Sequence, residues 1–311
     1  MKFLYLKKLS ISKEFLITIL FYIGLFLLPS AFSISAIFLL ISLIFNSLIN
    51  EENFFEDKFN IFFFCGSFLL VISSIMHNFR SNYLSYDPNS SLSWIGLANW
   101  IPFFWCYWGF KPLLNNSEKR KKSSLILLSG TFPVFITGLG QSFFNWDGPF
   151  EIFNGLIVWY QRPINEGEGI TGLFNNSNYL GCWLSIILPF SISTITSKNE
   201  YKFKNICALL ILITTTTALI MTKSRSAWGA LILSIHLIVG SSSLIWFLPL
   251  LVVITLIISF TVIPNNYPDL QLFMQSIIPK EFWREFSPKQ FDVPTRELRI
   301  TIWLFALKLI K

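Results

Sequence analysis

Apolar runs separated by short polar stretches follow one another along the whole chain. Most runs are roughly 17 to 25 residues long, the length that an α-helix needs to cross a hydrocarbon core of about 30 Å. They are continuous rather than alternating, which favours helices over membrane-spanning strands. We therefore predict an all-α, polytopic bundle of transmembrane helices. Its nine spans are at residues 15–28, 31–49, 59–76, 94–110, 123–140, 178–196, 206–221, 226–240 and 244–263, and a tenth starts near Ile300. Pro102 is expected to break the fourth span.

The composition agrees with this pattern. Hydrophobic residues make up 53% of the 311 residues and charged residues only 13%, whereas soluble domains carry about 25% charged residues. The formal net charge is +7, and in a membrane protein such an excess is typical of cations that anchor loops rather than of nucleic-acid binding. The lipid bilayer is therefore an expected partner, and nucleic acid is not.

The positions of the cations predict an orientation. If the N-terminus lies in the cytoplasm, the inner loops hold most of the lysines, including the run KRKK at residues 119–122. The short outer loops then hold few cations, and three of these are Arg162, Lys223 and Arg225. Because cytoplasmic loops of membrane proteins are enriched in Lys and Arg, we predict a multi-pass protein whose N-terminus is cytoplasmic.

The segment MTKSRSAWGALILS at residues 221–234 departs from that rule, because it places Lys223 and Arg225 in a short outer loop. Ser224 or Ser226 is a natural N-cap of the helix that follows. A helix start offers backbone N–H groups and the positive end of the helix dipole, and a guanidinium matches phosphate oxygens in a bidentate way. The segment therefore predicts a phosphate or diphosphate site at the outer surface; a cation that only anchors the helix end is the alternative.

Two other predicted outer segments are long. Residues 141–178 are rich in aromatic residues, Gly and Asn and carry Arg162, while residues 264–299 are polar and rich in proline. Long loops often carry function, so Arg162 is a further candidate for a phosphate contact. The asparagines at the end of the first segment either cap the next helix or bind sugar hydroxyls.

No metal or other cofactor is expected. The four cysteines lie apart in apolar segments without CxxC spacing, and the two histidines are far apart in the sequence. Neither pattern has the spacing of a metal-ligand set.

Three stretches occur in a characteristic order in the second half of the chain: TGLFNNSNYLG at residues 171–181, TKSRSAWGALI at residues 222–232 and RITIWLFALKLI at residues 299–310. Together they resemble the O-antigen ligase and O-antigen polymerase superfamily, and most of all its cyanobacterial-type members, some of which are labelled putative bicarbonate transporters. Upstream of Gly172 the chain matches the family in character only. We accordingly divide it into residues 1–170, N-terminal transmembrane helices and an outer loop, and residues 171–311, a ligase-like core.

The resemblance implies a GT-C-like helical fold in the plasma (inner) membrane. It also implies metal-independent transfer of a glycan from an undecaprenyl-diphosphate donor to a lipid or sugar acceptor on the periplasmic face. Matched residue by residue, it gives catalytic roles to Arg225 and Arg299, which would stabilise charge developing on the diphosphate. The expected substrate-binding residues are Lys223, Arg162, Gly172, Asn175 and Asn178.

One departure from the family concerns a periplasmic histidine that is thought to activate the acceptor hydroxyl. It lies beyond the third stretch, and this sequence ends at Lys311. The last apolar stretch, residues 300–310, is shorter than the roughly 20 residues of a full span. We therefore expect a chain cut short within a helix, and expect the family's chemistry in the longer protein.

Two other functional classes stay open, a transporter of bicarbonate or another small solute and a non-catalytic scaffold. Ion-coupled carriers usually place carboxylates near the bilayer midplane, whereas the acids here fall in predicted loops or at span ends. Within the enzyme class, ligase and polymerase differ in their acceptor, and the sequence does not distinguish them.

Overall fold

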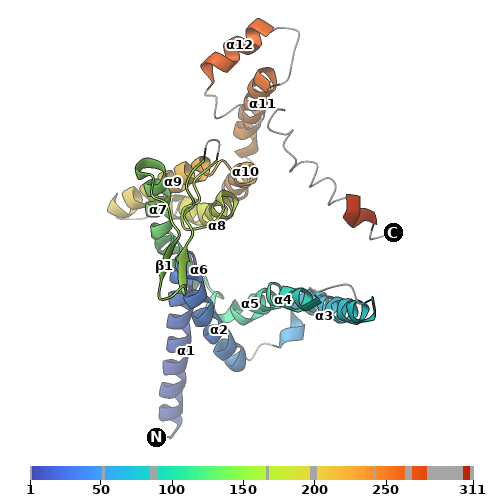
Figure 1. Cartoon of the computed structure of the whole chain (residues 1–311). Helices are drawn as coiled ribbons and strands as arrows, with labels where there is room; N and C mark the ends of the chain where they lie inside the picture. Colours follow the sequence, from blue (N-terminus) through green and yellow to red (C-terminus); the bar gives the residue numbers. More distant parts are fainter. Residues whose placement is uncertain are drawn as a thin grey trace. The chain divides into compact units, whose positions relative to one another are not determined.

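The computed structural model describes residues 2–50, 53–84, 90–165, 168–196, 202–240, 243–262, 268–278 and 304–308. It is mostly helical, with 79% of the described residues in helices (Figure 1). The chain forms two compact units. Unit 1 comprises residues 1–137 and 148–161, and unit 2 comprises residues 138–147 and 162–311. The sequence-based division at residue 170 concerns function and stays a prediction.

Unit 1 begins with a helical hairpin of α1 (Lys2–Leu27) and α2 (Phe32–Ile49). The turn at Pro29 and Ser30 lies where the sequence predicts it. Ser35 is fully buried between the two helices, and its hydroxyl donates to the carbonyl of Gly24 at 2.7 Å. A Cβ atom at Gly24 would lie 2.6 Å from the side chain of Leu39, so glycine permits the close approach of α1 and α2.

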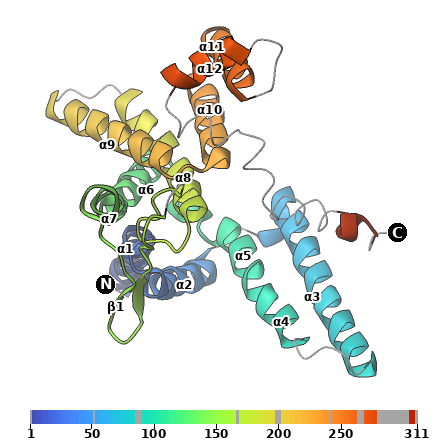
Figure 2. The same cartoon turned by 45° about the horizontal axis from the view of Figure 1, so that its top comes forward.

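The next elements of unit 1 are η1 (Phe54–Glu56), α3 (Lys58–Leu84), α4 (Ser90–Ala98), α5 (Ile101–Gly109) and η2 (Lys111–Leu113). Figure 2 shows α4 and α5 alongside α3, and the rings of Phe63 and Phe104 stack at 5.1 Å. The span predicted at residues 94–110, with its break at Pro102, consists of two short helices. Pro102 lies in the first turn of α5, where its missing N–H costs no helical hydrogen bond, so it starts a helix rather than kinking one.

The predicted span at residues 123–140 also consists of two helices, α6 (Ser117–Gly130) and α7 (Phe132–Phe144). α6 starts six residues earlier than predicted because the Asn116 side chain caps it, accepting from the Lys119 N–H at 2.8 Å. Gly130 ends α6 in close contact with α1: an added Cβ would lie 2.2 Å from the Phe26 carbonyl oxygen. α7 begins in unit 1 and ends in unit 2.

A β-hairpin interrupts the helical pattern. β1 (Phe150–Ile152) pairs antiparallel with β2 (Ile157–Trp159), a departure from the all-α prediction, which treats this stretch as an irregular loop. Phe153, Asn154 and Gly155 have φ values of 54°, 53° and 83° in the turn. The dipeptide Asn-Gly favours this left-handed conformation and was the local signal for the hairpin.

Unit 2 contains α8 (Ser177–Thr196), α9 (Lys202–Met221), α10 (Arg225–Val239), α11 (Ser243–Val262) and α12 (Pro268–Ile277). α8 packs against both α9 and α10, and α11 packs against α12 (Figure 1). The core of the unit is aliphatic, with Leu180, Leu184, Ile187, Leu188 and Leu219 almost completely buried. α12 lies within the stretch predicted as a polar loop.

Among the residues that the structure describes, four helical stretches are long and apolar enough to cross a membrane: Phe32–Ile49, Lys58–Phe79, Ser117–Phe144 and Ser177–Ile195. Shorter apolar helices occupy Ile206–Met221, Arg225–Ile238 and Val252–Thr261. Large apolar side chains of α3, such as Phe62 and Leu69, are more than half exposed. Apolar surface of this kind is unfavourable in water, so the structure supports association with a membrane. The number of spans and their orientation stay predictions.

Candidate functional site

The turn between α9 and α10 carries the KSRS segment. Thr222 is fully buried; its hydroxyl donates to the Leu219 carbonyl at 2.7 Å and accepts from the Ser224 N–H at 3.2 Å. Lys223 between them has a φ of 53°, so its backbone is left-handed and reverses the chain within one residue. Buried hydrogen bonds therefore fix the position at which α10 starts and Arg225 follows.

Ser224 occupies the N-cap position of α10, as one of the two predicted serines, but its hydroxyl does not cap the helix. It donates instead to the Asn178 side-chain oxygen at 2.9 Å. Asn178 lies in the first turn of α8, whose start is held by the Asn176 side chain, which accepts from the Asn178 N–H at 2.8 Å. This Ser224–Asn178 bond joins the beginnings of α8 and α10.

Close helix packing keeps the two helix starts together. A Cβ atom added to Gly181 in α8 would lie 2.9 Å from the Cβ atoms of both Ser224 and Ala227. A larger residue at position 181 would separate the helices, because a contact below 3.0 Å forces one partner to move.

The segment of residues 162–172 is held by one buried side chain. Gln141, which is 2% exposed, accepts from the N–H groups of Thr171 (2.8 Å) and Gly172 (3.0 Å) and donates to the Thr171 hydroxyl (3.1 Å) and the Arg162 carbonyl. The Arg162 N–H in turn donates to the Thr171 hydroxyl at 3.2 Å. Gln141 thereby fixes the backbone that carries Arg162.

Gly169 brings this segment against the end of α9. A Cβ atom at Gly169 would lie 1.9 Å from the Thr222 carbonyl oxygen, and the neighbouring Ile170 N–H donates to the Met221 carbonyl at 3.1 Å. Only glycine permits this approach, which places the segment of Arg162 next to the turn of Lys223.

These contacts enclose a pocket of about 590 Å³ in unit 2, here called the arginine pocket. Its charged and amide lining residues are Arg162, Glu168, Asn175, Asn176, Asn178, Lys223 and Arg225. Arg162, Arg225 and Asn178 are exposed, and Lys223 and Asn175 are half-buried. The volume falls within the roughly 300 to 1,000 Å³ of ordinary small-molecule sites.

The electrostatics of the arginine pocket favour an anion. Three cationic side chains and one carboxylate line it, and the carboxylate, Glu168, accepts from the Asn165 side chain at 3.0 Å within its own turn. α8 and α10 both begin at the pocket, so the positive ends of two helix dipoles add to the side-chain charge. Guanidinium groups and helix starts together are suited to a phosphate or diphosphate.

The structure thus brings together five of the seven residues singled out in the sequence, namely Arg162, Asn175, Asn178, Lys223 and Arg225. Gly172 is buried and does not line the pocket. It has a φ of 54°, and its N–H donates to the Gln141 side-chain oxygen at 3.0 Å. Arg299 lies outside the described residues.

Sequence reasoning missed the residues that build the walls, above all Gln141, Gly169 and Thr222. An amide side chain at the end of an apolar run was the available signal for Gln141, because such a group is buried only when hydrogen-bonded. The glycine and the threonine gave no local signal.

No protein-family model, curated protein or solved structure matches this chain.

Proposed function

We propose that this chain belongs to a membrane glycan transferase of the O-antigen ligase type, with a GT-C-like bundle of transmembrane helices. The proposed donor is an undecaprenyl-diphosphate-linked glycan and the acceptor is a lipid or sugar hydroxyl at the periplasmic face of the inner membrane. The observation that carries the proposal is the arginine pocket, where Arg162, Lys223 and Arg225 line one cavity at the starts of two helices.

The reaction places specific demands on such a site. The acceptor oxygen attacks the anomeric carbon of the donor, the bond from that carbon to the diphosphate oxygen breaks, and the proton of the acceptor hydroxyl is released to water. Negative charge then builds up on the lipid diphosphate that leaves. Arg225 and Arg162 supply charge-assisted hydrogen bonds where this charge develops, which is the electrostatic contribution to catalysis.

The amide side chains suit the other end of the donor. Asn175 and Asn178 line the same pocket as the cations, and amides both donate to and accept from sugar hydroxyls. Asn178 Oδ1 already accepts from Ser224, so its NH₂ group is the part suited to a glycan. Arg299 is proposed as a second catalytic arginine on the resemblance alone.

Binding of the leaving group tests the proposal directly. The full chain in detergent would be titrated with farnesyl diphosphate and with farnesyl monophosphate, comparing Arg225→Gln with Arg120→Gln as the control. Arg120 is an exposed cation of α6 in unit 1, outside the arginine pocket. We expect Arg225→Gln to weaken diphosphate binding about tenfold or more, because charged hydrogen bonds contribute roughly 1.5 to 3 kcal/mol. Equal binding of both lipids by all three proteins would contradict the proposal.

Transfer in cells tests the chemistry. In a host without its own ligase, the protein should attach glycan to surface acceptor, and Arg225→Gln should lower transfer about 100-fold or more at equal membrane abundance. Properly inserted protein without transfer from several donors, but with solute uptake, would favour the transporter alternative. Chain elongation without attachment to an acceptor would favour a polymerase.

A further inference from the structure

A second polar pocket lies in unit 1, at the start of α3, and neither the sequence motifs nor the proposed transferase site uses it. Its volume is about 400 Å³, and the residues that bear on its chemistry are Glu56, Asp57, Lys58, Asn60, Trp108 and Lys111. It is here called the α3 pocket. It differs from a simple helix start because buried polar groups of two helices line it.

Two buried polar atoms of this pocket lack a hydrogen-bond partner within the described part of the chain. One is an acceptor, Asn60 Oδ1, on a residue that is 1% exposed. The other is a donor, the indole Nε1 of Trp108. Leaving such a group unsatisfied costs about 1 to 3 kcal/mol, so buried groups of this kind usually have a partner.

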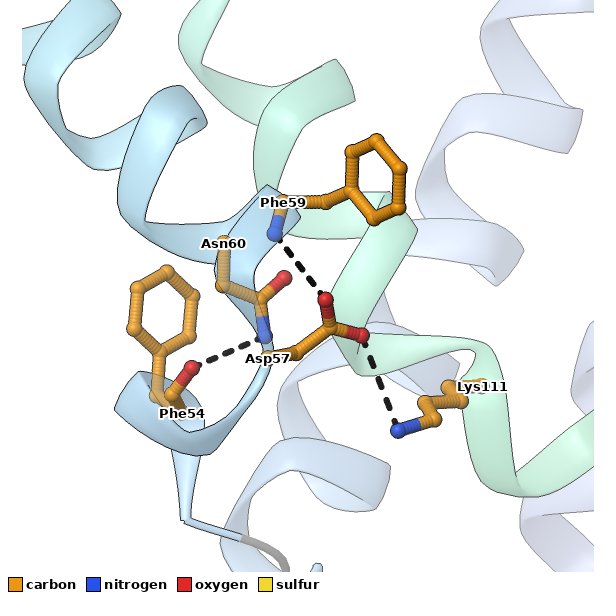
Figure 3. Close-up of polar contacts among 5 residues, drawn as sticks. All are labelled: Phe54, Asp57, Phe59, Asn60 and Lys111. Carbon is orange, nitrogen blue, oxygen red and sulfur yellow. Dashed lines mark hydrogen bonds and ion pairs between the residues drawn. The ribbon is translucent and has the colours of Figure 1, made fainter.

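The remaining contacts of Asn60 keep its oxygen in place. Its amide nitrogen donates to the Phe54 carbonyl at 2.9 Å, as Figure 3 shows, and its backbone N–H donates to the Asp57 carbonyl at 3.0 Å. The ring of Trp108 is likewise fixed by an edge contact with Phe54, with ring centroids 5.5 Å apart. Both atoms therefore belong to rigid walls.

The charges of the α3 pocket are balanced. Asp57 caps α3, accepting from the Phe59 N–H at 3.0 Å, and its other oxygen lies 3.8 Å from the Lys111 ammonium (Figure 3). Glu56 and Lys58 add one further charge of each sign. Two carboxylates beside two ammonium groups do not select a simple anion or a simple cation, whereas they match a ligand that carries both charges.

The position of the pocket narrows the choice of ligand. It lies at the first turn of α3, and Lys58–Phe79 is one of the stretches able to cross a membrane. The end of a membrane-crossing helix lies at the level of the lipid head groups, where Trp and Lys side chains are common.

We propose that the α3 pocket binds the zwitterionic head group of a membrane phospholipid with a primary ammonium, that is, an aminoethyl phosphate. The ammonium donates to Asn60 Oδ1 and to the carboxylates of Asp57 and Glu56. The phosphate oxygens accept from Trp108 Nε1 and from the ammonium groups of Lys58 and Lys111. A head group of this kind satisfies the buried acceptor and the buried donor at the same time.

Native mass spectrometry of the purified full chain in detergent tests this proposal. The probes are phosphatidylethanolamine, phosphatidylcholine and phosphatidylglycerol with identical acyl chains, and free glycerophosphoethanolamine. We expect phosphatidylethanolamine to bind at least about tenfold more tightly than the other two lipids. The trimethylammonium group of phosphatidylcholine has no N–H donors, and the head group of phosphatidylglycerol has no cation. Preference for the free head group over the lipid would identify a soluble zwitterion as the ligand and overturn the assignment to a lipid.

A matched pair of variants on α5 locates the site. Trp108→Phe keeps an aromatic side chain but removes the indole N–H, and we expect it to weaken phosphatidylethanolamine binding about fivefold. Trp105→Phe is the control, because the Trp105 indole already donates to the Ser47 hydroxyl at 2.9 Å and lies outside the pocket. Lys111→Gln, at a half-exposed position, gives an independent test if Trp108→Phe does not fold.

Equal affinity for the three lipids would overturn the proposal and leave ordered water as the partner of the two buried atoms. Equal losses in Trp108→Phe and Trp105→Phe would also overturn it. Neither result bears on the diphosphate test, because the two pockets share no residue.

Discussion

The arginine pocket of unit 2 and the α3 pocket of unit 1 both lie at the start of an apolar helix, yet they are built differently. The arginine pocket has three cations and one carboxylate, whereas the α3 pocket has two charges of each sign. The first is shaped by backbone contacts at Gly169 and by the buried Gln141. In the second, an exposed ion pair between Asp57 and Lys111 lies beside two buried polar atoms.

This difference shows that the charges lining a site and the contacts that hold the site in shape, its scaffold, are separate properties. An excess of cations favours an anion and costs self-repulsion, so a rigid scaffold is needed to hold the cations together. A balanced set of charges needs less support, because the charges attract one another. Substitutions of the residues that hold the pocket together should therefore lower the stability of the protein most in the arginine pocket. Substitutions of the surface charges should lower it little in the α3 pocket.

The largest effect is expected from Gly169→Ala. The new methyl group would meet the Thr222 carbonyl, so the segment of Arg162 must move away from the α9–α10 turn. We expect a loss of about 3 kcal/mol in the free energy of unfolding and loss of diphosphate binding. Thermal unfolding in detergent measures the first quantity.

Gly229→Ala is the control for that variant. A Cβ at Gly229, inside α10, would have no heavy atom of the described residues within 4 Å beyond its chain neighbours and the backbone of its own helix. Because alanine is the better helix former, we expect no loss and a gain of up to about 1 kcal/mol. Equal melting temperatures for the two variants would show that the close approach at Gly169 does not hold the pocket together.

Gln141→Leu should have an intermediate effect. It removes the acceptor of the Thr171 and Gly172 N–H groups, and we expect a loss of about 2 kcal/mol, with weaker diphosphate binding although no pocket-lining residue changes. Gln275→Leu is the matched control, since the Gln275 side chain is half-buried and donates a hydrogen bond to the Thr261 carbonyl at 2.8 Å. The free energy of unfolding would be measured for both variants. Similar losses of stability in the two would contradict a special role of Gln141.

The smallest effect is expected at Asp57. Asp57→Asn keeps an oxygen for the Phe59 N–H and loses only the ion pair with Lys111, for which we expect at most about 0.5 kcal/mol, because exposed pairs contribute little. Asp57→Ala also loses the cap and should cost about 1 kcal/mol. Chemical denaturation of both variants measures the difference. If Asp57→Asn lost more stability than Gln141→Leu, the charges of the α3 pocket would matter more for folding than the buried support of the arginine pocket, which is the opposite of what we expect.

The sequence predicted the helices of unit 2 closely. The predicted spans at residues 178–196 and 226–240 correspond to α8 (Ser177–Thr196) and α10 (Arg225–Val239). These elements are readable because an apolar run, its length and its capping residues are local properties. The break predicted at Pro102 is present, at residues 99–100 between α4 and α5. The β-hairpin and α12 were missed, because packing and turn geometry decided them within stretches that read as loops.

By itself, the sequence determined that this is a mostly helical protein suited to a membrane, and it singled out five of the residues that line the arginine pocket. Only the tertiary structure decided that Arg162 and Arg225, more than sixty residues apart, line the same cavity. The contacts responsible join Gln141 to Thr171 and Gly169 to Thr222. Hydrophobic patterns report which face of a helix avoids water, whereas these contacts depend on the paths of distant segments, which no local pattern encodes.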